Sequence, residues 1–141
     1  NGLFYSCENN ITASELQKSL TKIKTAIKND DEQAFASMLI YPFVYTPKRN
    51  EPDEDGSLFD YRKLNNASEI HQHYKAITTP LFKEVMACTS LSKMSASRNF
   101  GILLARGYIY FERDAASGEI KMLTIHAYTN VLKEWLKDHC Q

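Results

Sequence analysis

Hydrophobic residues recur at helical spacing near the start of the chain. The apolar positions are Leu16, Leu20, Ile23 and Ile27. Thr12 and Glu15 form a capping-box pattern just before them, which predicts an amphipathic helix from about Ser14 to Lys28. The lysines of this segment face mostly away from the apolar side, so we interpret them as a solvated face.

A second pattern covers the region from Gly101 to Tyr128. Residues 102–111 are apolar, β-branched and aromatic, residues 114–119 carry turn formers that include Gly118, and residues 120–128 alternate between apolar and polar. This pattern predicts a β-hairpin. We expect the rest of the chain to be organised around it, with the preceding helices covering one face of its sheet.

The chain between these two regions predicts shorter elements. Asp30 or Asp31 can cap a helix over 32–38, and a strand over 39–46 follows. That strand lies at an edge or is bulged, because Pro42 cannot donate to a ladder. A helix over 69–86 should break near Thr79, since Pro80 follows. Residues 47–57 read as an exposed loop, 58–64 as a short strand or turn, and 131–136 as part of a last helix.

This order of elements is typical of an α+β fold in which a curved antiparallel sheet wraps a long N-terminal helix. A chain of 141 residues has the size of one domain, so we interpret residues 1–141 as a single domain. Hydrophobic residues make up 43% and charged residues 24%, which is ordinary for a soluble globular protein.

Charge and hydropathy limit the partners. Seventeen basic residues balance seventeen acidic ones, which argues against nucleic acid or an anionic membrane as the main partner. No apolar run reaches the roughly 18 residues of a membrane span. The chain begins at Asn1 and not at Met, which fits either a shortened chain or a mature product from which a leader was removed. Export is therefore allowed, and we expect a periplasmic or secreted protein. A cytoplasmic location stays open.

Three cysteines, Cys7, Cys88 and Cys140, lack the close pairing of structural zinc sites, so neither a metal nor another cofactor is predicted. Cys7 and Cys140 lie near opposite ends of the chain, and the termini of a domain are often close together. A disulfide between these two is therefore one interpretation. A Cys7–Cys88 bond is its main rival, and three thiols in a reducing compartment are the third.

Several segments together resemble a known superfamily. They are residues 34–44 (AFASMLIYPFV), a helix with Tyr74 and Thr79-Pro80, and residues 101–111 (GILLARGYIYF). These patterns are similar to those of small, often exported bacterial proteins of the nuclear-transport-factor-2-like (cystatin-like) superfamily. The resemblance covers roughly residues 14–128.

The resemblance implies a conical pocket between helices and sheet, and a homodimer formed through the sheet. It does not imply a reaction, because this superfamily includes isomerases, dehydratases, cyclases, adaptors, immunity proteins and binding domains. Enzymes of this kind usually place an Asp/His or Tyr/Asp set in the cone. The predicted hairpin strands contain no Asp.

Candidate ligand-binding residues are polar or aromatic side chains on otherwise apolar elements. They are Tyr41, Tyr45, Tyr74, Arg106, Tyr108, His126 and Tyr128. His71, His73 and Tyr110 have the same character. The two histidines are two positions apart on a helix, so they do not share a face and are poor as a metal-binding pair. A packed structural role and an exposed aromatic surface for a protein partner are the alternatives.

The hairpin register decides which of these side chains meet. If Glu112 lies opposite Lys121, then Gly107 faces His126 and Ala105 faces Tyr128, and small residues opposite large ones leave a notch. A slip of one residue would send these side chains to the other face.

Two functional hypotheses follow. The first is a non-catalytic binding module or adaptor that holds a small molecule, a peptide or a partner protein, with an immunity protein as a special case. The second is a small isomerase, dehydratase or cyclase with His126 as base and Tyr128 or Arg106 polarising a substrate oxygen. The second requires these three side chains to converge in one cleft.

Overall fold

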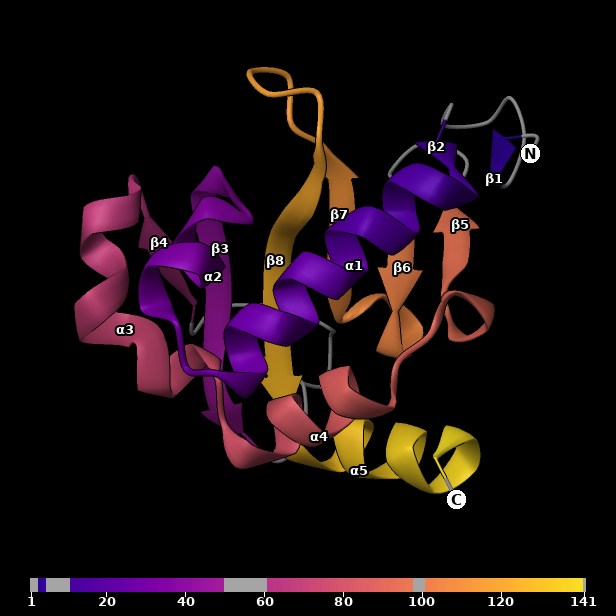
Figure 1. Ribbon diagram of the computed structural model, residues 1–141. Helices are drawn as coiled ribbons and strands as arrows, with labels where there is room; N and C mark the ends of the chain where they lie inside the picture. Colours follow the sequence, from indigo (N-terminus) through magenta and orange to yellow (C-terminus); the bar gives the residue numbers. More distant parts are fainter. Residues whose placement is uncertain (1–2, 5–10, 50–60, 98–100, 141) are drawn as a thin grey trace.

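The computed structural model describes residues 3–4, 11–49, 61–97 and 101–140. It is an α+β protein built on one six-stranded sheet (Figure 1). In spatial order the strands are β4 Arg62–Leu64, β3 Leu39–Arg49, β8 Ile120–Tyr128, β7 Ile109–Arg113, β6 Gly101–Leu104 and β5 Ser95–Ser97. A separate two-stranded ribbon joins β1, Leu3–Phe4, to β2, Ile11–Thr12.

The sheet is mixed, which corrects the prediction of an antiparallel sheet. Strands β3 and β8 run parallel, while the other four neighbouring pairs are antiparallel. Parallel neighbours need a crossover connection, and residues 50–119 between the two strands supply one. Pro42 lies in the segment where the β3–β8 register shifts, between Leu39 and Val44. The edge alternative for this strand is wrong, because β3 lies between β4 and β8, and the register irregularity around Pro42 agrees with the bulged alternative.

The predicted hairpin contains a break. The expected strand over 102–111 is divided by a turn, Ala105–Gly107, into β6 and β7, which pair with each other. Ala105, Arg106 and Gly107 have φ values of 51°, 62° and 88°, so the turn is left-handed. Glycine adopts that region readily, but Ala and Arg rarely do. The sequence therefore carried no signal of a turn at Ala105 and Arg106, and its apolar pattern predicted a continuous strand.

The β7–β8 register is right at one end and wrong at the other. Glu112 lies opposite Lys121, which is the pairing that the notch hypothesis assumed. A bulge between Tyr110 and Phe111 then shifts the register by one residue, and the His126 amide donates to the Tyr108 carbonyl at 2.7 Å. The expected pairs of Gly107 with His126 and of Ala105 with Tyr128 are therefore wrong.

The first helix, α1, spans Ala13–Lys28, close to the predicted range. Its capping box is present: the Glu15 amide donates to Thr12 Oγ1 at 3.1 Å, and the Thr12 amide donates to Glu15 Oε2 at 3.4 Å. The buried face of α1 contains Leu16, Ser19, Leu20, Ile23, Ala26 and Ile27.

The remaining helices follow the local signals. Helix α2, Glu32–Ser37, is capped by Asp31. The predicted break at Pro80 separates α3, Ile70–Ile77, from α4, Pro80–Cys88, and Thr79 Oγ1 caps α4. Helix α5, Thr129–His139, is the last helix of the described residues. Short 3₁₀ turns at Ala67–Glu69 and Leu91–Lys93 flank α3 and α4.

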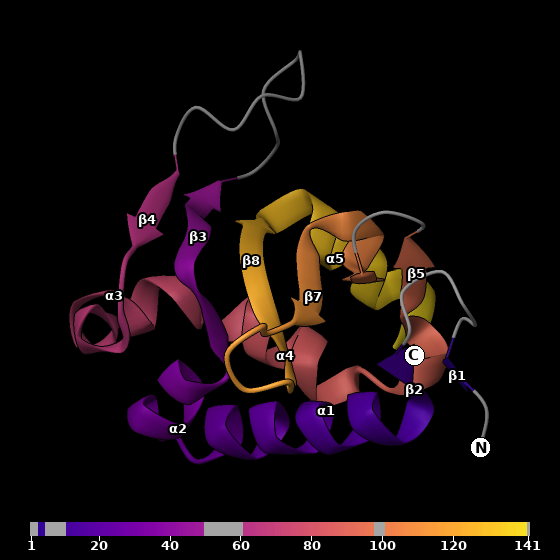
Figure 2. The same ribbon diagram turned by 90° about the horizontal axis from the view of Figure 1, so that it is seen from above.

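The helices gather on one face and at one end of the sheet. Helix α1 crosses in front of the sheet, and α4 and α5 lie at the end where β8 finishes (Figure 1). Seen from above, α1 runs along one side of the sheet and α3 lies beside β4 and β3 (Figure 2). Phe43, Phe111 and Met122 of the sheet are fully buried, as are Leu16 and Ile23 of α1.

The disulfide joins Cys88 to Cys140, with their Cα atoms 6.0 Å apart. The predicted Cys7–Cys140 bond is therefore wrong, because Cys140 is already bonded, and the Cys7–Cys88 rival fails for the same reason. Cys7 itself lies outside the described residues. The two bonded cysteines stand at the ends of α4 and α5, which pack together although 52 residues separate the cysteines.

Candidate binding site

Three of the predicted ligand-binding tyrosines form internal hydrogen bonds. Tyr41 Oη donates to the Ala36 carbonyl at 2.7 Å, and Tyr74 Oη donates to Asp30 Oδ1 at 3.1 Å. Burial raises the pKa of Tyr41 to about 12. Burial, followed by the hydrogen bond to Asp30, raises the pKa of Tyr74 to about 12 as well. Both hydroxyls therefore stay protonated and link elements of the fold.

Tyr45 also has a partner within the protein. Its hydroxyl lies 2.7 Å from His73 Nδ1, and the two rings meet edge to face with centroids 5.7 Å apart. Burial raises the pKa of Tyr45. The contact connects β3 to α3, so Tyr45 and His73 hold the helix against the sheet.

Three other predicted residues, Tyr108, His126 and Tyr128, come together. The Tyr108 and Tyr128 rings meet edge to face at 5.3 Å, and the His126 and Tyr128 rings stack at 6.5 Å. His126 Nδ1 lies 2.7 Å from Thr46 Oγ1, across the parallel β3–β8 junction. We call Thr46, Tyr108, His126 and Tyr128 the sheet cluster.

His126 is suited to a structural role. It is 7% exposed, and burial lowers its pKa, so the imidazole is neutral at physiological pH. Among the described residues its only side-chain hydrogen bond is to the Thr46 hydroxyl. A hydroxyl cannot stabilise an imidazolium as a carboxylate does, so the described environment does not prepare His126 to accept a proton.

Arg106 points to a different partner. Its Nη1 lies 3.1 Å from Glu134 Oε1 on α5, and both side chains are exposed. The left-handed turn that carries Arg106 thus lies against α5. Of the three residues in the enzyme hypothesis, His126 and Tyr128 are therefore buried together, while Arg106 lies at the surface in an ion pair with Glu134.

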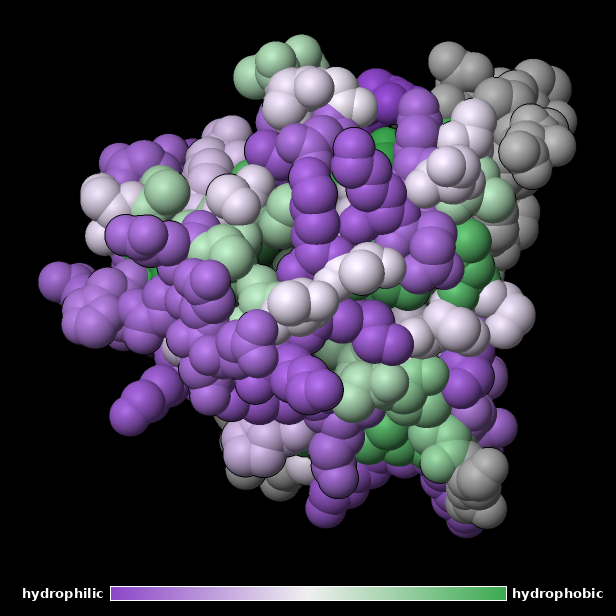
Figure 3. All heavy atoms as spheres, viewed as in Figure 1, coloured by the Kyte–Doolittle hydropathy of each residue, from purple (hydrophilic) through white to green (hydrophobic). Residues whose placement is uncertain are grey.

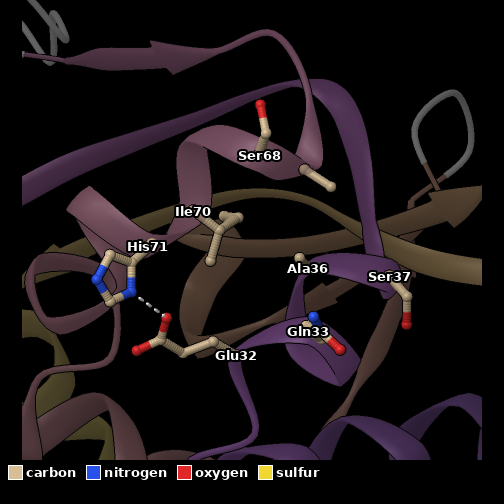
Figure 4. Close-up of a pocket in the computed structure, with 8 residues that line it drawn as sticks. Glu32, Gln33, Ala36, Ser37, Ser68, Ile70 and His71 are labelled. Carbon is tan, nitrogen blue, oxygen red and sulfur yellow. Dashed lines mark hydrogen bonds and ion pairs between the residues drawn. The ribbon is translucent and has the colours of Figure 1, made fainter.

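Hollows on the molecular surface offer other candidate sites. The first, the α2–α3 groove, has a volume of about 490 Å³ and lies between α2 and the start of α3 (Figure 4). Its floor contains Ala36 and Ile70. Glu32 and His71 face each other across it, with Oε1 and Nδ1 2.7 Å apart. The two ionisable groups of this groove thus satisfy each other.

A second hollow, the hairpin groove, has a volume of about 500 Å³ and lies between α1, α2 and the β7–β8 turn. Its two lysines are also paired. Lys22 Nζ lies 2.8 Å from Glu119 Oε2, and Lys121 Nζ lies 3.1 Å from Asp114 Oδ2. Each cation is therefore neutralised by a neighbouring carboxylate.

The third hollow, which we call the α1–α4 groove, has a volume of about 530 Å³. Its lining residues come from these two helices: Lys24, Thr25, Ile27, Lys28, Lys83, Met86 and Ala87. In Figure 3 hydrophilic side chains follow α1, and a hydrophobic patch lies below them over α4 and α5. Within the described part of the chain, Lys28 has no hydrogen bond or ion pair. Of the three hollows, this groove has a lysine for which the described residues provide no hydrogen-bond or ion-pair partner.

The sequence held only a weak signal for the α1–α4 groove. Lys24 and Lys28 are four residues apart on α1, and Lys83 and Ala87 are four apart on α4, so each pair shares a helix face. Lysines at this spacing are usually solvated. Only the packing of α4 against α1 reveals that the two faces border a common hollow.

No group of three His, Cys, Asp or Glu side chains in the described ranges is arranged to hold a metal ion. Among the helices of those ranges, none is both long and apolar enough to cross a membrane. No family model matches the chain, and no curated protein and no solved structure matches it either. Its function must therefore be inferred from its own residues.

Proposed function

We propose that this protein is a non-catalytic binding module that holds a segment of a partner protein in the α1–α4 groove. One observation carries the proposal: the groove combines an apolar floor with a lysine that has no partner among the described residues. Recognition sites typically combine apolar surface with a few polar groups that orient the ligand.

The packing between α1 and the sheet supports a site on the outer surface. Leu20 and Ile23 of α1 and Phe111 and Ile125 of the sheet are at most 1% exposed. Side chains therefore occupy the position in which the superfamily resemblance implies a conical pocket. A partner would reach the outer grooves without displacing this core.

We further propose that the chain has the nuclear-transport-factor-2-like fold and acts in the periplasm or another exported compartment. The first statement rests on the residue patterns that resemble the superfamily, residues 34–44 and 101–111 among them. The Cys88–Cys140 disulfide is compatible with the second, because such bonds persist mainly in oxidising compartments.

The enzyme hypothesis receives no support from the sheet cluster. It needs Arg106 beside His126 and Tyr128, but the guanidinium binds Glu134 on α5. Burial lowers the pKa of His126, which makes its imidazole a weaker base, and Nδ1 is hydrogen-bonded to the Thr46 hydroxyl. Holding a partner requires no such acid and base set.

Site-specific photo-cross-linking in cells of the source organism tests the proposal. A benzophenone side chain at Thr25 or Ala87, both exposed in the groove, should give one discrete adduct with a partner protein. The same group at Gln72, exposed on α3, is the control. Ala87→Arg, which fills the groove, should abolish the adduct formed from Thr25.

Two results would contradict the proposal. One is the absence of any adduct from Thr25 and Ala87, and the other is the same adduct from Gln72. An adduct with the mass of two chains would mean that the partner is a second copy of this chain, as in the homodimer that the superfamily resemblance implies.

A further inference from the structure

The walls of the α1–α4 groove are two helices packed against each other. Lys24, Thr25 and Lys28 line it from α1, and Lys83 and Ala87 line it from α4. The apolar side chains at its base are Ile27, which is 5% exposed, and Met86, which is 1% exposed. The lining is thus basic along both rims and apolar between them.

The positive charge of these rims is only partly balanced. Lys83 Nζ lies 2.7 Å from Asp30 Oδ1, so this cation has a carboxylate partner. Lys24 Nζ donates to the Thr89 carbonyl at 2.8 Å, which is a neutral acceptor. Lys28 has no hydrogen bond or ion pair among the residues the structure describes. Two of the three cations therefore keep a charge that an incoming carboxylate can complement.

The shape of the groove favours a helix over a lipid chain. It is a partly open hollow between two helices, and small-molecule sites usually enclose most of their ligand. A helix can instead lay an apolar stripe along such a hollow and keep its outer face in water. The lining residues span 24–28 of α1 and 83–87 of α4, about one turn of each helix, so the groove contacts about one turn of a docked helix.

We infer that the α1–α4 groove receives an amphipathic helix of a partner protein, with apolar residues on the groove floor and acidic residues beside Lys24 and Lys28. This inference rests on the proposed function and adds the chemistry of the partner. Carboxylates on the docked helix bind the lysines at the rims, and its Leu, Ile or Met side chains cover Ile27, Met86 and Ala87.

A pair of labelled peptides tests this chemistry by fluorescence anisotropy. Both form two to three helical turns with the same apolar stripe, and they carry Glu in one peptide and Lys in the other at every flanking position. The acidic peptide should bind at least about tenfold more tightly than the basic one. Its affinity should fall as salt is added, because the rim lysines are at the surface.

Matched variants locate the bound peptide. Lys28→Glu should weaken the acidic peptide by about fivefold or more, because it places like charges together. Lys137→Glu is the control, since Lys137 is also exposed in the last turn of a helix but belongs to α5. Ala87→Arg should abolish binding, and circular dichroism confirms that each variant is folded.

Equal binding of the two peptides overturns the inference, as does unchanged binding in Lys28→Glu. Displacement of the acidic peptide by dodecanoate at micromolar concentration also overturns it and indicates a lipid ligand. If the cross-link from Thr25 persists while the acidic peptide fails to bind, only the chemistry of the partner is wrong. If both fail, the proposed function is wrong as well.

Discussion

At the scale of single residues, the turn before β7 shows the cost of local geometry. Ala105 and Arg106 both have positive φ, a conformation that costs a residue with a Cβ about 1–2 kcal/mol. The turn gains contacts in exchange, since Arg106 pairs with Glu134 and Tyr108 packs on Tyr128. Strain of this kind persists only where the surrounding structure holds it in place.

Substitutions at Arg106 test this strain. Arg106→Gly should raise the free energy of unfolding by about 0.5–1 kcal/mol, because glycine adopts positive φ at no steric cost. Arg106→Val should lower it by about 1 kcal/mol or more, because a β-branched residue is poorly accommodated there. Urea unfolding measures both changes.

The Arg106–Glu134 ion pair needs a separate control. Glu134→Gln removes the ion pair but leaves the backbone as it is, and an exposed pair contributes at most about 1 kcal/mol. Equal stabilities of the glycine and valine variants would mean that the turn is not left-handed in solution.

His126 predicts a pH dependence of stability. Burial lowers its pKa below the ordinary value of 6.5, so at mildly acidic pH the unfolded chain binds a proton that the folded protein does not. Stability should therefore decrease as the pH falls below about 6.5. His126→Asn keeps an amide near Thr46 Oγ1 but cannot titrate, so urea unfolding between pH 7.5 and 5 should show a flatter profile. Parallel profiles would contradict the pKa shift.

At the scale of elements, the disulfide connects two helices at the same end of the sheet. Cys88 ends α4, and Cys140 follows α5, whose Leu132 and Trp135 are buried. Helix α5 also binds the strained turn through Glu134. The covalent link thus holds the last helix where it covers the end of β8.

Removing this link should destabilise the protein. The double substitution Cys88→Ser, Cys140→Ser should lower the free energy of unfolding by about 2–4 kcal/mol, because the unfolded chain regains the entropy of a long loop. Urea unfolding measures the change, and a reducing agent should have the same effect on the wild type.

The double variant provides the control, because a reducing agent should not change its stability. Mass spectrometry of a tryptic digest should find the Cys88 and Cys140 peptides linked without reduction. A peptide that links Cys7 to Cys140 would contradict the structure.

At the scale of the whole molecule, ion pairs join elements that are distant in sequence. Glu15 of α1 binds Arg113 of β7, with Nη2 and Oε2 2.8 Å apart, and Lys22 of α1 binds Glu119 beside the hairpin turn. The Arg113 hydrogen bond lowers the pKa of Glu15, and the Lys22 hydrogen bond lowers that of Glu119. Surface charge thus helps to hold α1 against the sheet.

These carboxylates predict the acid limb of the stability profile. Since their folded pKa values lie below 4.5, their contribution is complete above pH 4.5 and is lost as the pH falls through the folded values. Glu15→Gln should reduce the loss of stability between pH 5 and 2.5, measured by circular dichroism during urea unfolding. Glu84→Gln, at an exposed position on α4, is the matched control, and an equal effect of both would contradict the prediction.

Local sequence signals were sufficient for most individual elements. Thr12, Glu15 and the apolar spacing that follows predicted α1, and Pro80 predicted the break between α3 and α4. These predictions of helices succeed because capping, proline geometry and hydrophobic periodicity act within a few residues of the chain. The candidate residues Tyr108, His126 and Tyr128 lie together in the sheet cluster, but the register expected for them was wrong, and their ligand-binding role stays a prediction.

What only the tertiary structure decided depends on residues far apart in sequence. The parallel β3–β8 pairing, the Cys88–Cys140 bond and the partner of Arg106 all join segments that no local pattern connects. The expected hairpin notch is absent because a single bulge between Tyr110 and Phe111 shifts by one residue every pair farther from the turn. The α1–α4 groove exists because packing brings together two lysine-bearing helix faces that each look merely solvated in the sequence.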